Sequence, residues 1–300
     1  MKTNKTDNIV DETEGRARIL FGWQLKLVAI VAFIWSLFQL WYASPLPFMV
    51  GFGVFIDVPA RAIHLGFGLF LAFLLFPFHK KNRSKKINIL NFLLSITAFF
   101  VTFYLFYNYE ALVDRNGVLL KHPISLFGNK FVLPTELIIG GIGILLLLEA
   151  TRRAIGIPLV IVASIFLIYS IFGQSMPLMI SHQGLSLTRL VGYHWFGGEA
   201  IFGIPISVSV SFVFLFVLFG SMLDFAGGGK YFLDLAIALV GKFRGGPAKA
   251  SIMASGLTGM ISGSSIANVV TTGTFTIPIM KKTGFPAVKA GAIEVAASVN

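Results

Sequence analysis

Oxygen-bearing side chains gather in one stretch of the sequence, Ala250–Met280, which contains no ionisable side chain. Asn268 supplies an amide, and the stretch also carries ten hydroxyl residues, which are Ser251, Ser255, Thr258, Ser262, Ser264, Ser265, Thr271, Thr272, Thr274 and Thr276. Hydroxyl, amide and carbonyl oxygens can replace the hydration shell of a sodium ion, and the N–H groups at a helix start can bind an anion. The stretch therefore indicates ion binding without a carboxylate.

Basic residues flank this stretch on both sides. They are Lys242, Arg244 and Lys249 before it, and Lys281, Lys282 and Lys289 after it. If basic residues stay on the cytoplasmic side of a membrane, the chain must return to the side from which it entered. The stretch is too short for two spans of about 20 residues, but it suffices for two helical arms of about 13 residues, each ~20 Å long. This predicts a re-entrant hairpin with its tip near Gly263–Ser265.

The residues alone leave two interpretations of this stretch open. In the hairpin, non-helical backbone at membrane depth has to line a polar pocket, because hydrocarbon cannot satisfy its N–H and C=O groups. Alternatively, Ala250–Thr271 is one packed span in which small and hydroxyl residues let neighbouring helices approach closely. The flanking charges favour the hairpin.

The elements that would position these residues are membrane helices. Hydrophobic residues make up 56% of the 300-residue chain and charged residues only 12%, with a mean hydropathy of +0.83, whereas soluble domains carry about 25% charged residues. Apolar stretches long enough to cross a bilayer occur at Trp23–Tyr42, Ala62–Phe78, Ile89–Tyr107, Phe131–Leu148, Ile155–Phe172 and Ile201–Leu223. The sequence therefore predicts an all-α polytopic transmembrane fold with about six spans plus the re-entrant hairpin.

The charge distribution predicts orientation and excludes several functions. The net charge is +11, but the basic residues form short clusters between apolar stretches, which suits anionic lipid headgroups and argues against nucleic acid as a partner. Lys80–Lys86 contains five basic residues and Ala43–Pro59 contains none, which predicts a cytoplasmic N-terminus. The chain has no cysteine, and we find no Ser/His/Asp set or pair of acids for catalysis, so we expect no enzyme.

Three acidic residues lie within or beside the apolar stretches. Glu136 follows Pro134 at the start of a predicted helix, where an acid complements the helix dipole. Glu149 is three and four residues before Arg152 and Arg153, a spacing that allows ion pairs along one helix. Glu294 lies inside the last apolar helix, where an ionisable group is costly and therefore indicates a function; we identify no partner for it from the sequence.

Several motifs around the hairpin resemble those of a known transporter family. Arg244–Lys249, Ile261–Val270 and Gly273–Lys281 look like the corresponding segments of tripartite ATP-independent periplasmic (TRAP) transporters. Glu149–Arg153, followed by Gly156–Pro158, resembles the junction at which the small and large membrane subunits are fused in one type of these permeases. The resemblance is most distinctive from Glu149 to Asn300.

The resemblance implies an organisation and a mechanism. Residues 1–150 would form a small-subunit-like four-helix membrane scaffold, and residues 151–300 the start of a large-subunit-like transport domain that continues past Asn300 to a second hairpin. Such permeases lie in the cell inner membrane and move by an elevator-like mechanism, with sodium as the coupling ion and no other cofactor. A soluble periplasmic solute-binding protein delivers their substrate, a small organic acid. The alternative is a non-transporting membrane scaffold or truncated subunit.

The resemblance also assigns roles to residues near the hairpin tip. Ser264, Ser265 and Asn268 match the family's tip motif, and Thr271 and Thr272 follow it. We expect these residues to bind substrate and sodium, with Ser264 and Asn268 as sodium ligands and the tip amides on the substrate carboxylate.

Overall fold

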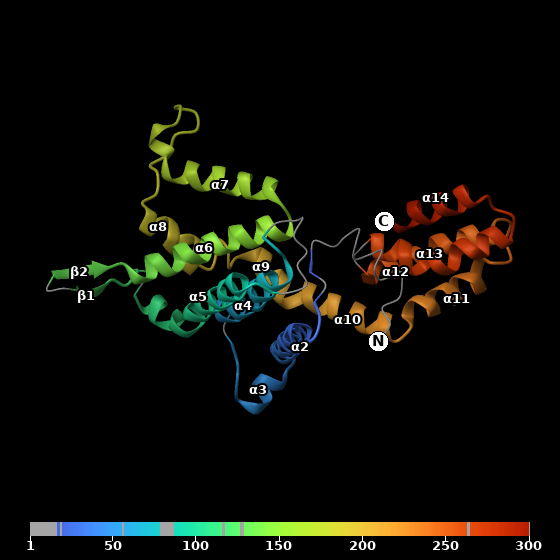
Figure 1. Cartoon of the computed structure of the whole chain (residues 1–300), viewed down its shortest axis with the longest axis horizontal. Coiled ribbons are helices and arrows are strands. Elements are labelled where there is room, and N and C mark those ends of the chain that lie inside the picture. Colours follow the sequence, from blue (N-terminus) through green and yellow to red (C-terminus); the bar gives the residue numbers. More distant parts are fainter. Residues whose placement is uncertain are drawn as a thin grey trace. The chain divides into compact units, whose positions relative to one another are not determined.

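The computed structural model describes residues 17–18, 20–55, 57–78, 87–115, 118–126, 129–262 and 265–299. The described residues fall into two compact units, one within Arg16–Ser211 and one from Phe212 onward. Apart from one short β-hairpin, all regular elements in this part of the chain are helices (Figure 1). These two units do not test the predicted domain boundary at residue 150, which stays a prediction.

The first unit is built on a bundle of long helices. They are α2 (Trp23–Ala43), α4 (Asp57–Leu75), α5 (Ile89–Asp114), α6 (Thr135–Ala154) and α7 (Ile157–Ile171). Shorter helical segments complete it: α3 (Leu46–Val50), η1 (Gly173–Ser175), α8 (Leu187–Val191), η2 (Gly192–Phe196) and α9 (Ile204–Val208). Helices α4 and α5 pack along each other, and α6 packs on both.

The hydrophobic core of this unit lies where α6 meets the η2 turn. Trp195 and Phe202 are fully buried there, and their rings lie edge to face with centroids 5.5 Å apart. Glycine at position 143 makes room for the indole, because a Cβ atom at this position would lie 2.3 Å from Trp195 Cζ2. The absence of a side chain on this face of α6 is therefore a packing requirement.

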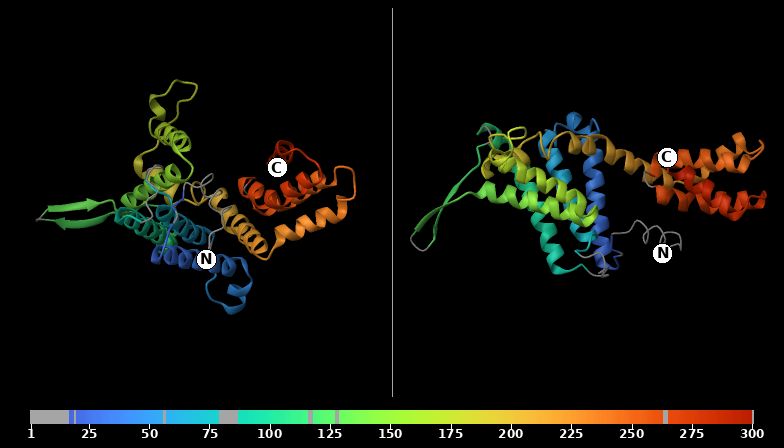
Figure 2. Two further views of the ribbon diagram at one scale, coloured as in Figure 1. Left: turned by 45° about the vertical axis from the view of Figure 1, so that its right-hand side comes forward. Right: turned by 90° about the horizontal axis from the view of Figure 1, so that it is seen from above.

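A β-hairpin replaces the start of the predicted fourth span. Strands β1 (His122–Leu126) and β2 (Asn129–Leu133) pair antiparallel and project away from the helices (Figure 2). The prediction that a helix begins at Phe131 is wrong, since α6 begins at Thr135, after Pro134. The apolar residues of β2 extend the hydrophobic run of α6 in the sequence, and proline, which favours extended backbone before it, separates the two elements.

Glu136, in the first turn of α6, is an internal ion-pair partner rather than only a dipole complement. Its side chain is fully buried and lies 2.9 Å from Arg115 Nη2. It also accepts hydrogen bonds from Tyr104 Oη, at 3.0 Å, and from the backbone N–H of Leu120, at 2.5 Å. At the other end of α6, the predicted pairs of Glu149 with Arg152 and Arg153 are confirmed, both at 2.7 Å.

The described part of the second unit contains five helices: α10 (Phe214–Phe225), α11 (Gly228–Val240), α12 (Gly246–Ser262), α13 (Ser265–Lys282) and α14 (Ala287–Ser298). Gly227 has a φ of 91° between α10 and α11, a left-handed conformation that glycine adopts without strain and that separates the two helices. Small side chains at Ala236, Ala250 and Ala254 let α11 and α12 pack closely. Helices α12, α13 and α14 pack pairwise against one another (Figures 1 and 2).

Four helical stretches are long and apolar enough to cross a bilayer: Trp23–Ala43, Asp57–Leu75, Ile89–Asp114 and Ile204–Leu223. The last of these joins α9 and α10 through the π-helical η3 (Ser209–Val213). Helix α7 is apolar but shorter, with 15 residues. The chain is therefore an all-α multi-pass membrane protein, as predicted. Residues 250–271 fall within α12 and α13, and the re-entrant position of this helical pair stays a prediction.

Candidate functional site

Three helices of the second unit present polar residues to one another at a spacing of four. Residues four apart lie on the same face of a helix, so each helix contributes a polar stripe. The members are at most 3% exposed. We call them the buried polar cluster, and they are Ser251 and Ser255 on α12, Asn268, Thr272 and Thr276 on α13, and Glu294 and Ser298 on α14.

Glu294 lies at the centre of one layer of this cluster. Its Oε2 atom accepts hydrogen bonds from Ser251 Oγ, at 2.5 Å, and from Thr276 Oγ1, at 2.6 Å. Its Oε1 atom contacts Thr272 Oγ1 in a further hydrogen bond. One carboxylate thus links α14 to both arms of the helical pair α12 and α13.

Asn268 organises a second layer, one helical turn nearer the residues that join α12 to α13. Its Nδ2 group donates to the carbonyl oxygen of Ser255, at 2.9 Å, and to Ser255 Oγ, at 3.0 Å. Ser255 Oγ lies 2.7 Å from Ser298 Oγ, so this layer also connects all three helices. The Oδ1 atom of Asn268 is buried, and no donor in the described part of the chain reaches it.

The electrostatic feature of the cluster is a single buried acid among neutral groups. Among the described residues, no lysine, arginine or histidine forms an ion pair with Glu294, although its side chain is fully buried. Burying an ionised carboxylate without a positive partner costs several kcal/mol, of order 3–5 when a partner is removed. The cluster therefore combines a row of oxygen atoms with one buried carboxyl group that has no cationic partner among the described residues.

The structure places the predicted site residues differently. Asn268 and Thr272 belong to the buried polar cluster, whereas Ser265 is exposed at the first position of α13. Ser264 and the side chain of Thr271 lie outside the described residues. The roles of all five in substrate and sodium binding stay predictions.

Sequence reasoning missed most partners of Glu294. It singled out Glu294 because of its apolar surroundings, and it counted Ser251, Ser255 and Thr276 among the hydroxyl residues without assigning them to the site. The spacing of four between Ser251 and Ser255, between Thr272 and Thr276, and between Glu294 and Ser298 was the available signal. It defines which face of each helix is polar, although only the folded structure shows that the three faces meet.

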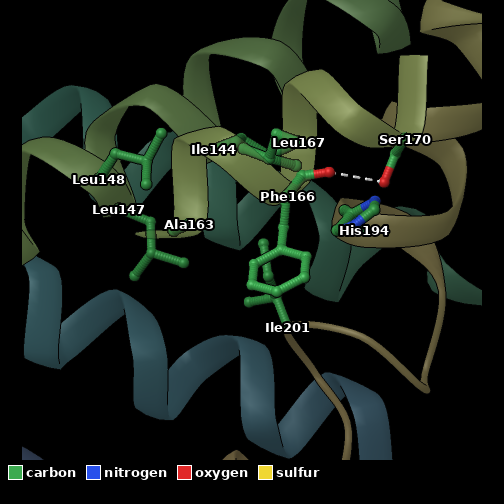
Figure 3. A pocket seen from close by; sticks show the side chains of 9 residues that line it. All are labelled: Ile144, Leu147, Leu148, Ala163, Phe166, Leu167, Ser170, His194 and Ile201. Carbon is green, nitrogen blue, oxygen red and sulfur yellow. Dashed lines mark hydrogen bonds between the residues drawn. The ribbon is translucent and has the colours of Figure 1, made fainter. Parts of the chain in front are cut away.

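A cavity in the first unit is unsuited to the same chemistry. It has a volume of about 280 Å³ and is lined mainly by apolar side chains of α6 and α7, together with Ile201 (Figure 3). Ser170 Oγ donates to its own helix at Phe166 O, at 2.8 Å, and His194 Nδ1 lies 2.9 Å from Leu190 O. With these two polar groups engaged by the backbone, the cavity presents an apolar lining and not a site for an anion.

Comparison with known proteins identifies the family. The family model described as "Tripartite ATP-independent periplasmic transporter, DctM component" matches residues 142–300. The chain belongs to this family. The matched region contains every member of the buried polar cluster. The family is one of transporter permeases, not a class of enzymes.

Individual relatives agree with this assignment. The chain is 27% identical over 169 residues to the uncharacterized protein YgiK of Salmonella typhimurium, covering 56% of this chain and 34% of that protein. It is 39% identical over 71 residues to the C4-dicarboxylate TRAP transporter large permease protein DctM of Rhodobacter capsulatus, covering 24% of this chain and 16% of that protein. The corresponding Vibrio cholerae protein is 41% identical over 70 residues.

The matched stretches cover about a third or less of the length of these curated relatives. No solved structure matches the chain. The family membership thus rests on the sequence of the DctM-like region, and the substrates in the relatives' names belong to those relatives.

Proposed function

We propose that this chain is the membrane permease component of a sodium-coupled secondary transporter for small organic acids. It works with a periplasmic solute-binding protein and moves by an elevator-like mechanism in the cell inner membrane, with its N-terminus in the cytoplasm. The observation that carries this proposal is the match of residues 142–300 to the TRAP permease family. The named relatives from Rhodobacter capsulatus and Vibrio cholerae make C4-dicarboxylates the first substrates to test.

The buried polar cluster supports the proposal through its position. It lies where α12 and α13 return along each other and where α14 covers them. Paired helices that end at membrane depth are the elements that bind substrate and coupling ions in many secondary transporters. Ser264 and Asn268 remain our assigned sodium ligands at the tip, and the amides there remain the assigned contacts of the substrate carboxylate.

Uptake into proteoliposomes tests the proposal. The natural full-length permease, reconstituted with a purified periplasmic solute-binding protein from the same organism, should accumulate radiolabelled succinate or malate only when both sodium outside and the binding protein are present. Replacing sodium by choline at equal ionic strength should abolish uptake. Uptake that ignores the sodium gradient would contradict the coupling, and a correctly inserted protein that takes up no organic acid would point to a non-transporting scaffold.

The re-entrant position of the hairpin has its own test. The 300 residues contain no cysteine, so a single cysteine in place of Ser264 can be labelled with a membrane-impermeant thiol reagent from each side once thiols elsewhere in the natural chain are removed. We expect labelling that sodium slows. A thiol that stays unreactive in every condition would indicate a packed span instead of a tip.

A further inference from the structure

The hydroxyl groups around Glu294 carry too few hydrogens for the contacts they make. Thr272 Oγ1 lies 2.7 Å from the carbonyl oxygen of Asn268 as well as against Glu294. Thr276 Oγ1 lies 3.0 Å from the carbonyl oxygen of Thr272 and 2.6 Å from Glu294. Together with Ser251, three hydroxyls therefore make five contacts with four acceptor oxygens, and each hydroxyl has one hydrogen to donate. The two carbonyl oxygens among these acceptors also accept backbone N–H groups within α13. The layer contains an excess of acceptors.

The two threonines can turn their lone pairs toward this layer without moving their helices, and a cation fits among the oxygen atoms once the Glu294 side chain moves back from its hydrogen-bond distances of 2.5 and 2.6 Å to Ser251 and Thr276. A threonine hydroxyl in a helix commonly donates to the carbonyl four residues earlier, and both carbonyls are already within hydrogen-bond distance. When Thr272 and Thr276 donate there, their lone pairs point toward the carboxylate of Glu294. Lone pairs and a carboxylate facing one another repel, unless a positive charge lies between them.

From these contacts we propose that Glu294 forms a binding site for a small monovalent cation together with Ser251, Thr272 and Thr276. The site lies one helical turn further along α13 than Asn268, within the helical body and away from the tip. This proposal deepens the proposed function. It rests on that function for the identification of the ion as the sodium that drives transport.

Charge balance selects a monovalent ion. Glu294 is the one acidic residue in the cluster, and no group of three or more histidine, cysteine, aspartate or glutamate side chains in the described part of the chain could hold a metal ion. One carboxylate and one monovalent cation leave a neutral buried site, whereas a divalent ion would leave an excess positive charge in a region of low dielectric. Oxygen ligands are those that hard cations prefer.

Two further observations around the layer fit a ligand. Asn268 Oδ1 is a buried acceptor without a donor in the described residues, and it lies on the same face of α13 as Thr272. Gly273 keeps α13 close to α14, since a Cβ atom there would lie 3.2 Å from Glu294 Cγ. The structure thus holds the carboxylate against the hydroxyls of α13 and leaves one neighbouring oxygen available.

Thermal unfolding of the purified full-length permease, without substrate or binding protein, tests the site. At constant pH and ionic strength, sodium in place of choline should raise the melting temperature by roughly 5 °C at saturation, because a ligand that binds only the folded state stabilises it. Glu294→Gln keeps the size of the side chain but removes the charge, and it should reduce this rise to the part contributed by the sodium site assigned to the tip. Glu136→Gln, which changes the other buried glutamate, is the matched control and should retain the full rise.

The second variant protects the test against misfolding. Thr276→Val removes one oxygen while keeping the shape, and we expect the sodium concentration at half-maximal stabilisation to increase at least tenfold. A wild-type response to sodium in Glu294→Gln, or an unchanged midpoint in Thr276→Val, would overturn the site. Stabilisation by acid alone, with no effect of sodium at any pH, would also overturn it, because the ligand would then be a proton.

The experiment separates this inference from the proposed function. If succinate uptake fails while the sodium-dependent stabilisation is present and requires Glu294, the cation site stands and the transport proposal falls. If sodium drives uptake equally well in wild type and Glu294→Gln, the proposed function stands and the site at Glu294 falls.

Discussion

Two fully buried glutamates of the described residues, one in each unit, have opposite surroundings. Glu136 in the first unit has a guanidinium 2.9 Å away, a tyrosine hydroxyl and a backbone N–H. Glu294 in the second unit has only hydroxyl groups as hydrogen-bond partners among the described residues. A paired charge is a structural element, because its partner is always present. Under our proposal, the partner of the buried acid at Glu294 is instead a ligand, which enters and leaves.

The largest predicted effect lies in the first unit. Arg115→Ala should lower the free energy of unfolding by about 3–5 kcal/mol, because it leaves the carboxylate of Glu136 buried without its cation. Denaturation of the purified protein in detergent, followed by tryptophan fluorescence, measures this loss. Adding sodium should not restore the stability of this variant; restoration would show that Glu136 too belongs to an ion site and would remove the contrast.

The next prediction for the first unit concerns the packing of α6 against Trp195. Gly143→Ala should cost about 1–3 kcal/mol, the usual cost of overpacking a core, because the new Cβ atom would lie 2.3 Å from the Trp195 ring. Gly141→Ala is the control on the same helix, since no atom lies within 4 Å of a Cβ at that position. Equal melting temperatures for the two variants would show that the contact of α6 with Trp195 is not tight.

In the second unit, substituting the buried glutamate should not lower the free energy of unfolding. In sodium-free buffer, Glu294→Gln should leave the protein as stable as the wild type or more stable by about 1 kcal/mol, since it removes an uncompensated buried charge and adds amide hydrogens to an acceptor-rich layer. Unfolding in choline chloride measures it. A loss of more than about 2 kcal/mol there would mean that the ionised carboxylate is itself a strong structural element.

The smallest effect is expected at the other end of α6. Glu149→Gln should lower stability less than Arg115→Ala does, because this carboxylate is partly exposed and the amide oxygen of glutamine can still accept a hydrogen bond from the buried Arg153. Arg153 keeps its hydrogen bond to Asn91 Oδ1, at 2.9 Å. The same denaturation assay applies, and a loss comparable to that of Arg115→Ala would show that the Glu149 cluster is part of the core.

The sequence predicted the helices of the chain well because apolar stretches of this length have few alternatives in a membrane protein. The packing of α12 against α13 agrees with the two helical arms predicted from composition and flanking charge, and their re-entrant position stays a prediction. The start of α6 was missed because Phe131–Leu133 continues the apolar run, although it belongs to β2. The pairing of Glu136 with Arg115 was missed because the chain between them passes through the β-hairpin.

The site was predicted in part for a similar reason. The composition of Ala250–Met280 identified the region. Glu294 was identified because an ionisable side chain inside an apolar helix is energetically costly. Which hydroxyls surround the carboxylate depends on the register of three helices, and that register is set by side-chain packing between residues up to 43 positions apart, such as Ser251 and Glu294. No pattern within a single helix contains this information.

Direct binding of radioactive sodium is the measurement that tests the central claim most directly. It requires the purified full-length permease, the Glu294→Gln variant and the Glu136→Gln variant, compared at one pH without substrate. We predict saturable binding to the wild type and to Glu136→Gln, with affinity at least tenfold weaker for Glu294→Gln. Equal binding by all three proteins would contradict the claim that the unpaired glutamate of the hairpin region is a cation ligand.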